Sequence, residues 1–351
     1  MNRTLTSLLA AAAVVGATGG TVAAVSLGGP ARDRDPSALD AGSSSADATT
    51  PDAADPVFWT NGRVLRDGDR EVRYDLPAPP TSLARAADAW VVTTFVDPTV
   101  SDVHVVRPDG SVTYLAGVNG EGDVSPDGTR YVGVDDLTQR PTVWDLATGE
   151  EVEVISGATP DQESVGGAQF VDDDTVAAGW RPARGPDVVL SGDLGSDERT
   201  VVSDDWAGAW SISPDGRWFA AIARTGVDAE TGFELCALLA PTDRSDEGVT
   251  DCGSTFFGLP VFAPDSSAVL AYDTAADPRL WPTGGGGPSD LVTPATTVDV
   301  ALLDRDRVLV LSSADAAGDG TVVSVCDVVG ECDDVDTFGD AAQTAVLGSR
   351  S

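Results

Sequence analysis

From Val57 to the C-terminus, short apolar runs alternate with polar turn residues. The runs are rich in Val, Ile, Leu, Trp, Phe and Tyr, and Gly, Pro, Asp and Ser separate them. We find no convincing apolar spacing of three to four residues, which is the spacing a helix would need. Short apolar runs bounded by turn residues are typical of β-strands. The pattern therefore predicts an all-β fold.

One turn recurs between pairs of these apolar runs. It occurs as Ser125, Pro126, Asp127 and Gly128, as Ser213, Pro214, Asp215 and Gly216, and in a third copy that keeps Pro264 and Asp265 but has lost the glycine. Proline presets φ at the second turn position, aspartate bonds to its own backbone, and glycine accepts a positive φ. Each copy therefore predicts a hairpin between two strands.

The turns repeat at a regular interval. Equivalent positions are Ala87, Asp127, Asp173, Asp215, Asp265 and Arg305, which are separated by 40 to 50 residues. A period near 40 to 45 residues is that of a four-stranded propeller blade. The predicted blades are 81–117, 122–155, 166–203, 207–253, 257–294 and 296–338. Within the second of these, strands are expected at 122–125, 130–135, 141–145 and 151–155.

Two segments remain outside these six blades. Residues 57–76 read as two strands around Asp67-Gly68-Asp69, and residues 343–347 read as one inner strand. Pairing of these segments in one sheet would close the ring and remove the free sheet edges. We therefore predict a β-propeller of seven four-stranded blades, with six or eight as the alternatives, closed by N- and C-terminal strands in one blade.

The repeat resembles the WD40-like propeller repeats of the TolB type. Their signature is an apolar strand, the sequence Ser-Pro-Asp-Gly followed by Arg or Lys, and a second apolar strand; the units around Asp127, Asp215 and Asp265 carry it recognisably. The resemblance spans roughly 57–347 and implies a fold. TolB has an additional α/β domain before its propeller, for which the polar segment here leaves no room. The resemblance therefore does not carry TolB's partners over to this chain.

The N-terminal segment predicts export. Arg3 precedes an apolar run over 5–27, and the chain turns polar at Arg32. Residues 1–30 are expected to be a signal peptide or an N-terminal membrane anchor, 31–56 a flexible polar linker, and 57–351 the propeller domain. A cleaved signal and an uncleaved anchor both stay open. Both place the body outside the cytoplasm, in the cell envelope or secreted.

Charge narrows the range of partners. The formal net charge is −36, from 57 acidic and 21 basic residues, and every basic side chain except one histidine is arginine. Such a polyanion is repelled by nucleic acid and by anionic membrane surfaces. The expected partner is a protein or a glycan, and the expected state is a monomer.

The sequence assigns no catalytic, cofactor-binding or metal-binding residue. His104 is the single histidine and lies inside an apolar strand, which is typical of a structural histidine. No Gly-x-Ser-x-Gly elbow is present, and no hydrolase domain follows the propeller. Acidic clusters at 135–136, 172–174, 204–205 and 333–334 lack EF-hand spacing, so Ca²⁺ is the one cofactor left open.

Tryptophans divide into two expected groups. Trp90, Trp144 and Trp218 lie inside strands, where a propeller packs aromatic rings between blades. Another four lie nearer strand ends or loops, and one or two of these are expected to line a binding face: Trp59, Trp180, Trp206 and Trp281.

The four cysteines predict two disulfides. An oxidising compartment favours pairing, and four cysteines allow three pairings. The residues between Cys326 and Cys332 read as a hairpin turn, and Cys236 and Cys252 occupy the corresponding strands of the blade at 207–253, around a longer loop. Facing strand residues lie within the Cα range that a disulfide accepts. We predict Cys236–Cys252 and Cys326–Cys332.

These observations favour an exported, envelope-associated propeller that acts as a non-enzymatic binding or scaffold module. The alternative is a propeller enzyme with a carboxylate or Ca²⁺ site at the mouth of the central channel. Three to five acidic side chains converging on the channel would favour the enzyme. A mouth lined by small or apolar residues would favour binding.

Overall fold

The computed structural model describes residues 58–96, 100–156, 163–181, 187–204, 209–228, 232–244, 247–256, 259–273, 275–314, 320–338 and 346–349. This part of the chain contains 28 β-strands. The predicted all-β class is confirmed.

The strands form seven groups, which we call units one to seven; β7 is shared by two of them, and unit six has five strands because its inner strand is interrupted. Unit one is β28 (Val346–Ser349), β1 (Phe58–Thr60), β2 (Val64–Asp67) and β3 (Arg70–Arg73). Unit two is β4 (Pro80–Arg85), β5 (Trp90–Phe95), β6 (Val100–Val106) and the first part of β7 (Val112–Val124). Unit three is the last part of β7, β8 (Arg130–Asp135), β9 (Pro141–Asp145) and β10 (Glu151–Val154).

Units four to six follow the same antiparallel order. Unit four is β11 (Glu163–Phe170), β12 (Thr175–Arg181), β13 (Val188–Asp193) and β14 (Thr200–Ser203). Unit five is β15 (Trp210–Ile212), β16 (Trp218–Asp228), β17 (Gly232–Pro241) and β18 (Val249–Asp251). Unit six has an interrupted inner strand, β19 (Ser254–Thr255) and β20 (Val261–Phe262), followed by β21 (Ala268–Asp273), β22 (Pro278–Pro282) and β23 (Ser289–Asp290).

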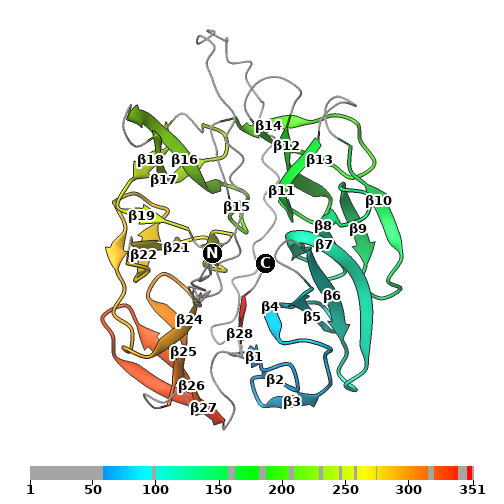
Figure 1. Cartoon of the computed structure of the whole chain (residues 1–351), viewed down its shortest axis with the longest axis vertical. Helices are drawn as coiled ribbons and strands as arrows, with labels where there is room; N and C mark the ends of the chain where they lie inside the picture. Colours follow the sequence, from blue (N-terminus) through cyan, green and yellow to red (C-terminus); the bar gives the residue numbers. More distant parts are fainter. Residues whose placement is uncertain are drawn as a thin grey trace, which may run out of the picture.

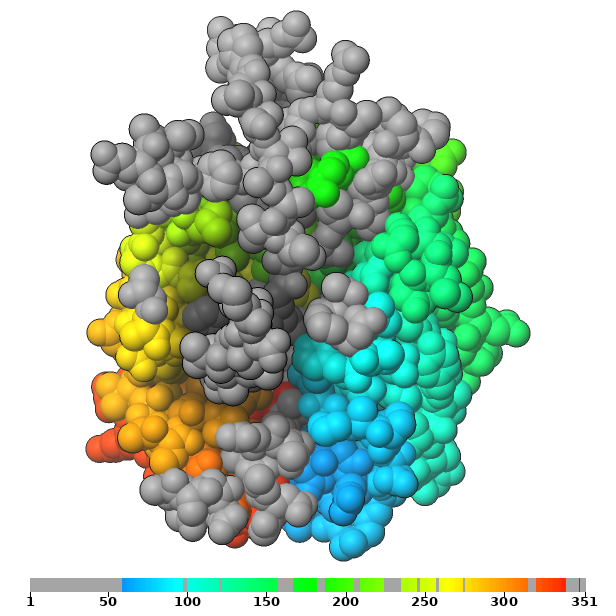
Figure 2. Space-filling view, in the orientation of Figure 1, coloured from blue at the N-terminus to red at the C-terminus, as the bar shows by residue number. Residues whose placement is uncertain are grey.

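Unit seven is β24 (Thr297–Leu302), β25 (Arg307–Ser313), β26 (Thr321–Asp327) and β27 (Cys332–Phe338). The units follow one another around a central axis (Figure 1), and the surface view shows the same circular succession from blue to red (Figure 2). Units one to three belong to one continuous sheet of eleven strands. The division into seven separate blades therefore stays a prediction.

The two ends of the described chain meet in one sheet. Strand β1 pairs antiparallel with β28, with Trp59 opposite Leu347. On its other side β28 pairs in parallel with β4, with Gly348 opposite Leu83. The predicted closure by terminal strands is confirmed. The N-terminal segment supplies three strands rather than the two expected. The Asn61 side chain accepts the N–H groups of Arg63 and Val64, and this turn connects the additional strand β1 to β2.

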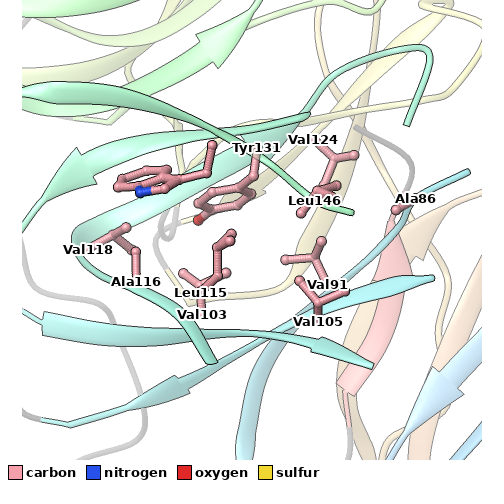
Figure 3. Close-up of a cluster of buried hydrophobic side chains, with 11 residues drawn as sticks. Ala86, Val91, Val103, Val105, Leu115, Ala116, Val118, Val124, Tyr131 and Leu146 are labelled. Atoms are coloured by element: carbon pink, nitrogen blue, oxygen red, sulfur yellow. The ribbon is translucent and has the colours of Figure 1, made fainter. Parts of the chain in front are cut away.

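The core lies between neighbouring units. Figure 3 shows the cluster between units two and three, where the Tyr131 ring lies among side chains of β5, β6 and β7. Tyr131 also contacts the Trp144 ring at a centroid distance of 6.1 Å. Large apolar side chains that alternate along each strand fill this space, so each unit is stabilised by the next.

Three of the four tryptophans among which one or two were expected to line a binding face lie in the core instead. Trp59, Trp180 and Trp281 are each at most 3% exposed. That expectation was wrong for these three, because strand ends here are covered by the adjacent sheet. Trp206 lies outside the described residues. Trp90 and Trp144 are buried, as predicted.

Candidate functional site

The inner strands direct backbone groups toward the centre of the ring. In unit five, Ser213 N–H donates to Trp218 O, so these two residues form a hydrogen-bonded pair across the hairpin. Ile212, the preceding residue, is opposite Phe219 in a pair without ladder bonds. Its N–H and C=O therefore point away from the sheet. Such groups need another partner when they are buried.

Two polar side chains supply that partner from the preceding unit. Phe170 N–H in unit four donates to Asp123 Oδ2 in unit three at 2.9 Å. Ile212 N–H in unit five donates to Gln169 Oε1 in unit four, also at 2.9 Å. Asp123 and Gln169 occupy the same place in their repeats, four residues before the turn aspartates Asp127 and Asp173. We call these contacts inner-strand latches.

A third latch holds the closing strand. Leu347 N–H in β28 donates to Asp299 Oδ2 in β24 at 3.2 Å, and Val300 N–H donates to Asp299 Oδ1 at 2.9 Å. Burial raises the pKa of Asp299 to about 6, although these two hydrogen bonds lower it. The Asp299 charge also contributes, after burial, to a raised pKa of Tyr272 in β21. The seam between units seven and one thus contains a carboxylate that titrates near neutral pH.

The Pro-Asp-Gly turns have the internal bonds that their sequence predicts. In unit three, Ser125 Oγ donates to Asp127 Oδ1 at 2.6 Å, and Arg130 N–H donates to Ser125 Oγ at 2.9 Å. In unit five, Ser213 Oγ donates to Asp215 Oδ1 at 2.6 Å. Gly128 has φ of 71° and Gly216 of 70°, the left-handed region that favours glycine.

The turns also bond to one another around the ring. Ala87 N–H donates to Gly128 O at 3.0 Å, and Asp127 N–H donates to Asp173 Oδ1 at 2.8 Å. Asp215 N–H donates to Ser266 Oγ at 3.0 Å. Ser266 replaces the turn glycine and has φ of 60°. In the sequence this turn differs from the others by the loss of its glycine. The Ser266 hydroxyl at that position connects units five and six.

A cavity of about 170 Å³ opens among the inner strands of units two to six. Its lining is mostly small or apolar: Ser82, Leu83, Ala84, Val91, Thr93, Gly122, Asp123, Val124, Pro126, Tyr131, Gln169, Phe170, Ser211, Ile212, Pro214, Leu259, Pro260, Val261 and Phe262. Among these residues Asp123 is the one carboxylate, and it accepts the Phe170 N–H. The exposed turn prolines Pro126 and Pro214 lie at its edge, so the repeated turns themselves border the opening.

His104 lies away from this cavity, in β6. It is buried, its Nε2 is 3.4 Å from Thr94 Oγ1, and its ring meets the edge of Tyr114 at a centroid distance of 5.9 Å. Burial lowers its pKa, while the charge of Asp102 acts in the opposite direction. These contacts are those of a packed, neutral histidine.

Several acidic clusters of the sequence complete turns. Asp172 Oδ1 accepts the N–H groups of Asp174 and Thr175, and Asp135 Oδ1 accepts those of Leu137 and Thr138. Within the described ranges, no group of three or more His, Cys, Asp or Glu side chains is placed to hold a metal ion.

The structure contains two disulfides, in the pairings expected from the sequence. Cys326 and Cys332 are directly opposite in β26 and β27, with Cα atoms 4.0 Å apart. Cys236 in β17 joins Cys252, which directly follows β18, with Cα atoms 4.1 Å apart. In each pair one cysteine is buried and the other is exposed.

The described residues contain no helix long and apolar enough to cross a membrane. The expected signal or anchor segment and the polar linker lie outside the described residues. The domain division therefore stays a prediction.

Comparison with solved structures gives the fold. An oligogalacturonate lyase from Vibrio parahaemolyticus matches with a TM-score of 0.50 at 14% identity, over 80% of this chain and 84% of that one. Together with the ring of four-stranded units, this decides the architecture. The chain is a β-propeller. At this level of identity the lyase shows a shared fold and nothing about activity.

Two further matches have lower scores. TolB from Acinetobacter baumannii matches with a TM-score of 0.42 at 14% identity, over 84% of this propeller and 66% of the TolB chain. The β-propeller domain of Cps50 (Swd1) from Myceliophteria thermophila matches with a TM-score of 0.48 at 10% identity, over 76% of this chain and 88% of that one. The propeller thus spans just under two thirds of TolB. No protein-family model and no curated protein sequence matches it.

Sequence reasoning did not identify the inner-strand latches. A usable signal exists, since the position four residues before the turn aspartate holds Asp123 and Gln169. This rule does not identify Asp299. The position equivalent to Gln169 in unit seven is Ala301, and Asp299 lies two residues before it on the same face of the strand.

Proposed function

We propose that this propeller is an exported, envelope-associated binding module that receives a protein partner at the cavity bordered by the repeated turns. The composition of the cavity wall carries the proposal. Apolar and small side chains dominate the described lining, and the one carboxylate among these residues, that of Asp123, accepts a backbone hydrogen bond. Concave, largely apolar surfaces with a few oriented polar groups are typical of binding sites.

The disulfides support the extracytoplasmic part of the proposal. Disulfides persist in oxidising compartments and are rare in the cytosol. Both pairs lie within one unit, and each contains one exposed cysteine. The apolar N-terminal run supports the same location through its resemblance to a secretion signal.

The charge of the molecule supports a neutral or basic partner. At −36 the long-range field repels polyanions and attracts cationic surfaces, so ionic strength will change the association rate. Basic proteins of the envelope fit this field better than acidic glycans do.

Two experiments test the proposal. The full chain with a C-terminal tag is expressed, cells are fractionated, and protease is added outside; a body protected in the cytosol would overturn the location. A photo-reactive residue at Pro214, on the cavity edge, is expected to crosslink a protein in intact cells. The same residue at exposed Glu150, in the turn between β9 and β10, is the control and should not give that product.

A further inference from the structure

Resting on the proposed function, we propose that the cavity binds an extended peptide segment by backbone pairing with the open strand edges of Val124 and Phe262. These residues belong to units three and six, whose inner strands both contribute to the cavity wall. The partner would contribute an apolar segment of several residues in β conformation. Its main chain would complete hydrogen bonds that this chain leaves open.

The register of the hairpins fixes the direction of these edges. Ser125 N–H donates to Arg130 O at 2.9 Å, and Ala263 N–H donates to Ala268 O at 2.8 Å. Val124 and Phe262 each precede one of these bonded positions, opposite Tyr131 and Val269 respectively. In an antiparallel ladder bonded and non-bonded pairs alternate. The N–H and C=O of both residues therefore point away from their sheets.

Three equivalent edges in the ring are occupied. Phe170 N–H donates to Asp123, and Ile212 N–H donates to Gln169. In unit two, β4 pairs with the backbone of β28, with Ser349 opposite Ala84. These three cases show two ways in which an inner edge is completed: by a side chain from the preceding unit or by an added strand.

At the two open edges the preceding unit offers no suitable side chain. The residue that would reach Val124 is Leu83, which has no acceptor. The residue that would reach Phe262 is Ser211, whose short side chain instead accepts Gln169 Nε2–H at 3.1 Å. No side chain among the described residues accepts the N–H of Val124 or Phe262. At these two edges the latch position thus holds Leu83 and Ser211 in place of a long acceptor side chain such as Asp123 or Gln169.

The chemistry of these edges selects a peptide. Each edge presents one N–H and one C=O of the same residue, which matches the donor and acceptor spacing of a β-strand added alongside. The neighbouring Pro126, Pro214 and Pro260 provide apolar contacts for its side chains. An anionic ligand would satisfy the donors alone, and it would face Asp123 within a molecule of charge −36.

The substitution Ser211→Gln tests the edge at Phe262. Its longer amide is expected to reach the Phe262 N–H as Gln169 reaches that of Ile212, so the edge is closed while the fold is preserved. The probe is a random peptide library displayed on phage, from which binders to the full wild-type chain are selected. Ser211→Gln is expected to weaken their binding about tenfold, the scale of a lost hydrogen bond to a desolvated donor, without lowering the Tm. Ser211→Ala, which cannot close the edge, should retain binding.

The substitution Val124→Pro tests the opposite edge. Proline removes the N–H and places its ring there, and it is tolerated where the N–H does not belong to the ladder. Leu302→Pro is the matched control, since Leu303 N–H donates to Arg307 O and gives Leu302 the same register outside the cavity. Both variants lose a buried side chain, but only Val124→Pro should abolish peptide binding.

The outcomes separate this inference from the proposed function. Selected peptides that bind equally well to Ser211→Gln and Val124→Pro would overturn the site and leave a binding module. Neutral oligosaccharides that bind while the library yields no peptide would overturn the peptide assignment. A protein crosslinked at Pro214 whose binding is lost in Ser211→Gln and kept in Ser211→Ala would support both proposals.

Discussion

Asp299 and Leu347 join the two ends of the ring: the carboxylate on β24 of unit seven accepts the backbone N–H of the closing strand β28 at 3.2 Å. Leu347 is itself buried, in a cluster with Trp59 and side chains of β24, β25 and β26. The contact between units seven and one therefore combines one hydrogen bond to a carboxylate with the burial of the Leu347 side chain in an apolar cluster.

Asp299→Asn is expected to stabilise the protein above pH 6. The folded-state pKa of about 6 exceeds the usual unfolded value of about 3.9, so the folded state favours the protonated form. The ionised Asp299 carboxylate therefore lowers the free energy of unfolding by its full amount above pH 6, and this loss disappears as the pH falls below about 4. Asparagine removes the charge but keeps only one of the two oxygens that accept the Leu347 and Val300 N–H groups, so the net gain should be about 1 kcal/mol at pH 7.5. Denaturant titrations of both proteins at pH 4 and pH 7.5 measure it. A gain of equal size at both pH values would contradict this explanation.

Deleting residues 343–351 is expected to lower stability by several kcal/mol, a large share of a typical total of about 5 to 15. The deletion removes β28, exposes the edges of β1 and β4, and leaves the Trp59 cluster without Leu347. Thermal unfolding measures the effect. Deleting residues 350–351 alone is the control and should leave the Tm unchanged. A stable protein without β28 would show that the ring closes by other contacts.

Gly128→Ala is expected to cost more than 2 kcal/mol, compared with about 1 kcal/mol for Gly195→Ala. Both glycines have positive φ, 71° and 75°. A Cβ on Gly128 would overlap the backbone N of Ala87 in the preceding unit, whereas a Cβ on Gly195 meets nothing within 4 Å. The difference between the two variants thus measures the contact between turns rather than the backbone conformation. Urea titrations provide it, and equal losses would show that the turns do not support each other.

Mapping of peptides under non-reducing conditions is expected to find Cys236 linked to Cys252 and Cys326 linked to Cys332 in the exported protein. Loop-entropy arguments give about 3 kcal/mol for a loop of about 15 residues and less for the shorter one, so replacing Cys236 and Cys252 by Ala should cost more than replacing the other pair. A peptide that links unit five to unit seven, or four thiols open to alkylation, would contradict the pairing.

The repeats could be predicted because their information is local. Pro, Asp and Gly in the turns act on their own backbone, and each hairpin lies within a short stretch of sequence. The disulfide pairings follow from the same local register. The latches could not be predicted in this way, because Asp123 and Phe170 are 47 residues apart and their contact depends on the register of two hairpins.

Exposure was the least predictable property. Trp59 and Trp281 lie at strand ends in the sequence, but adjacent sheets cover both. Likewise, Ser266 reads as a lost turn glycine, yet its hydroxyl accepts the Asp215 N–H of the preceding unit. Contacts between units determine the burial of these tryptophans and the hydrogen bond of Ser266. The sequence pattern of a single repeat does not predict such contacts.

The strand β7 belongs to two units, and this limits where the chain can be cut. It pairs with β6 over Val112–Asn119 and with β8 at its other end, so one strand is the outer member of unit two and the inner member of unit three. Gly122 permits this passage, because a Cβ there would overlap Val132 O and the Tyr131 hydroxyl. A protease cut or an engineered terminus inside β7 would remove a strand from two sheets at once. Fragments that end on either side of it should therefore reassemble only as a pair, and neither should fold alone.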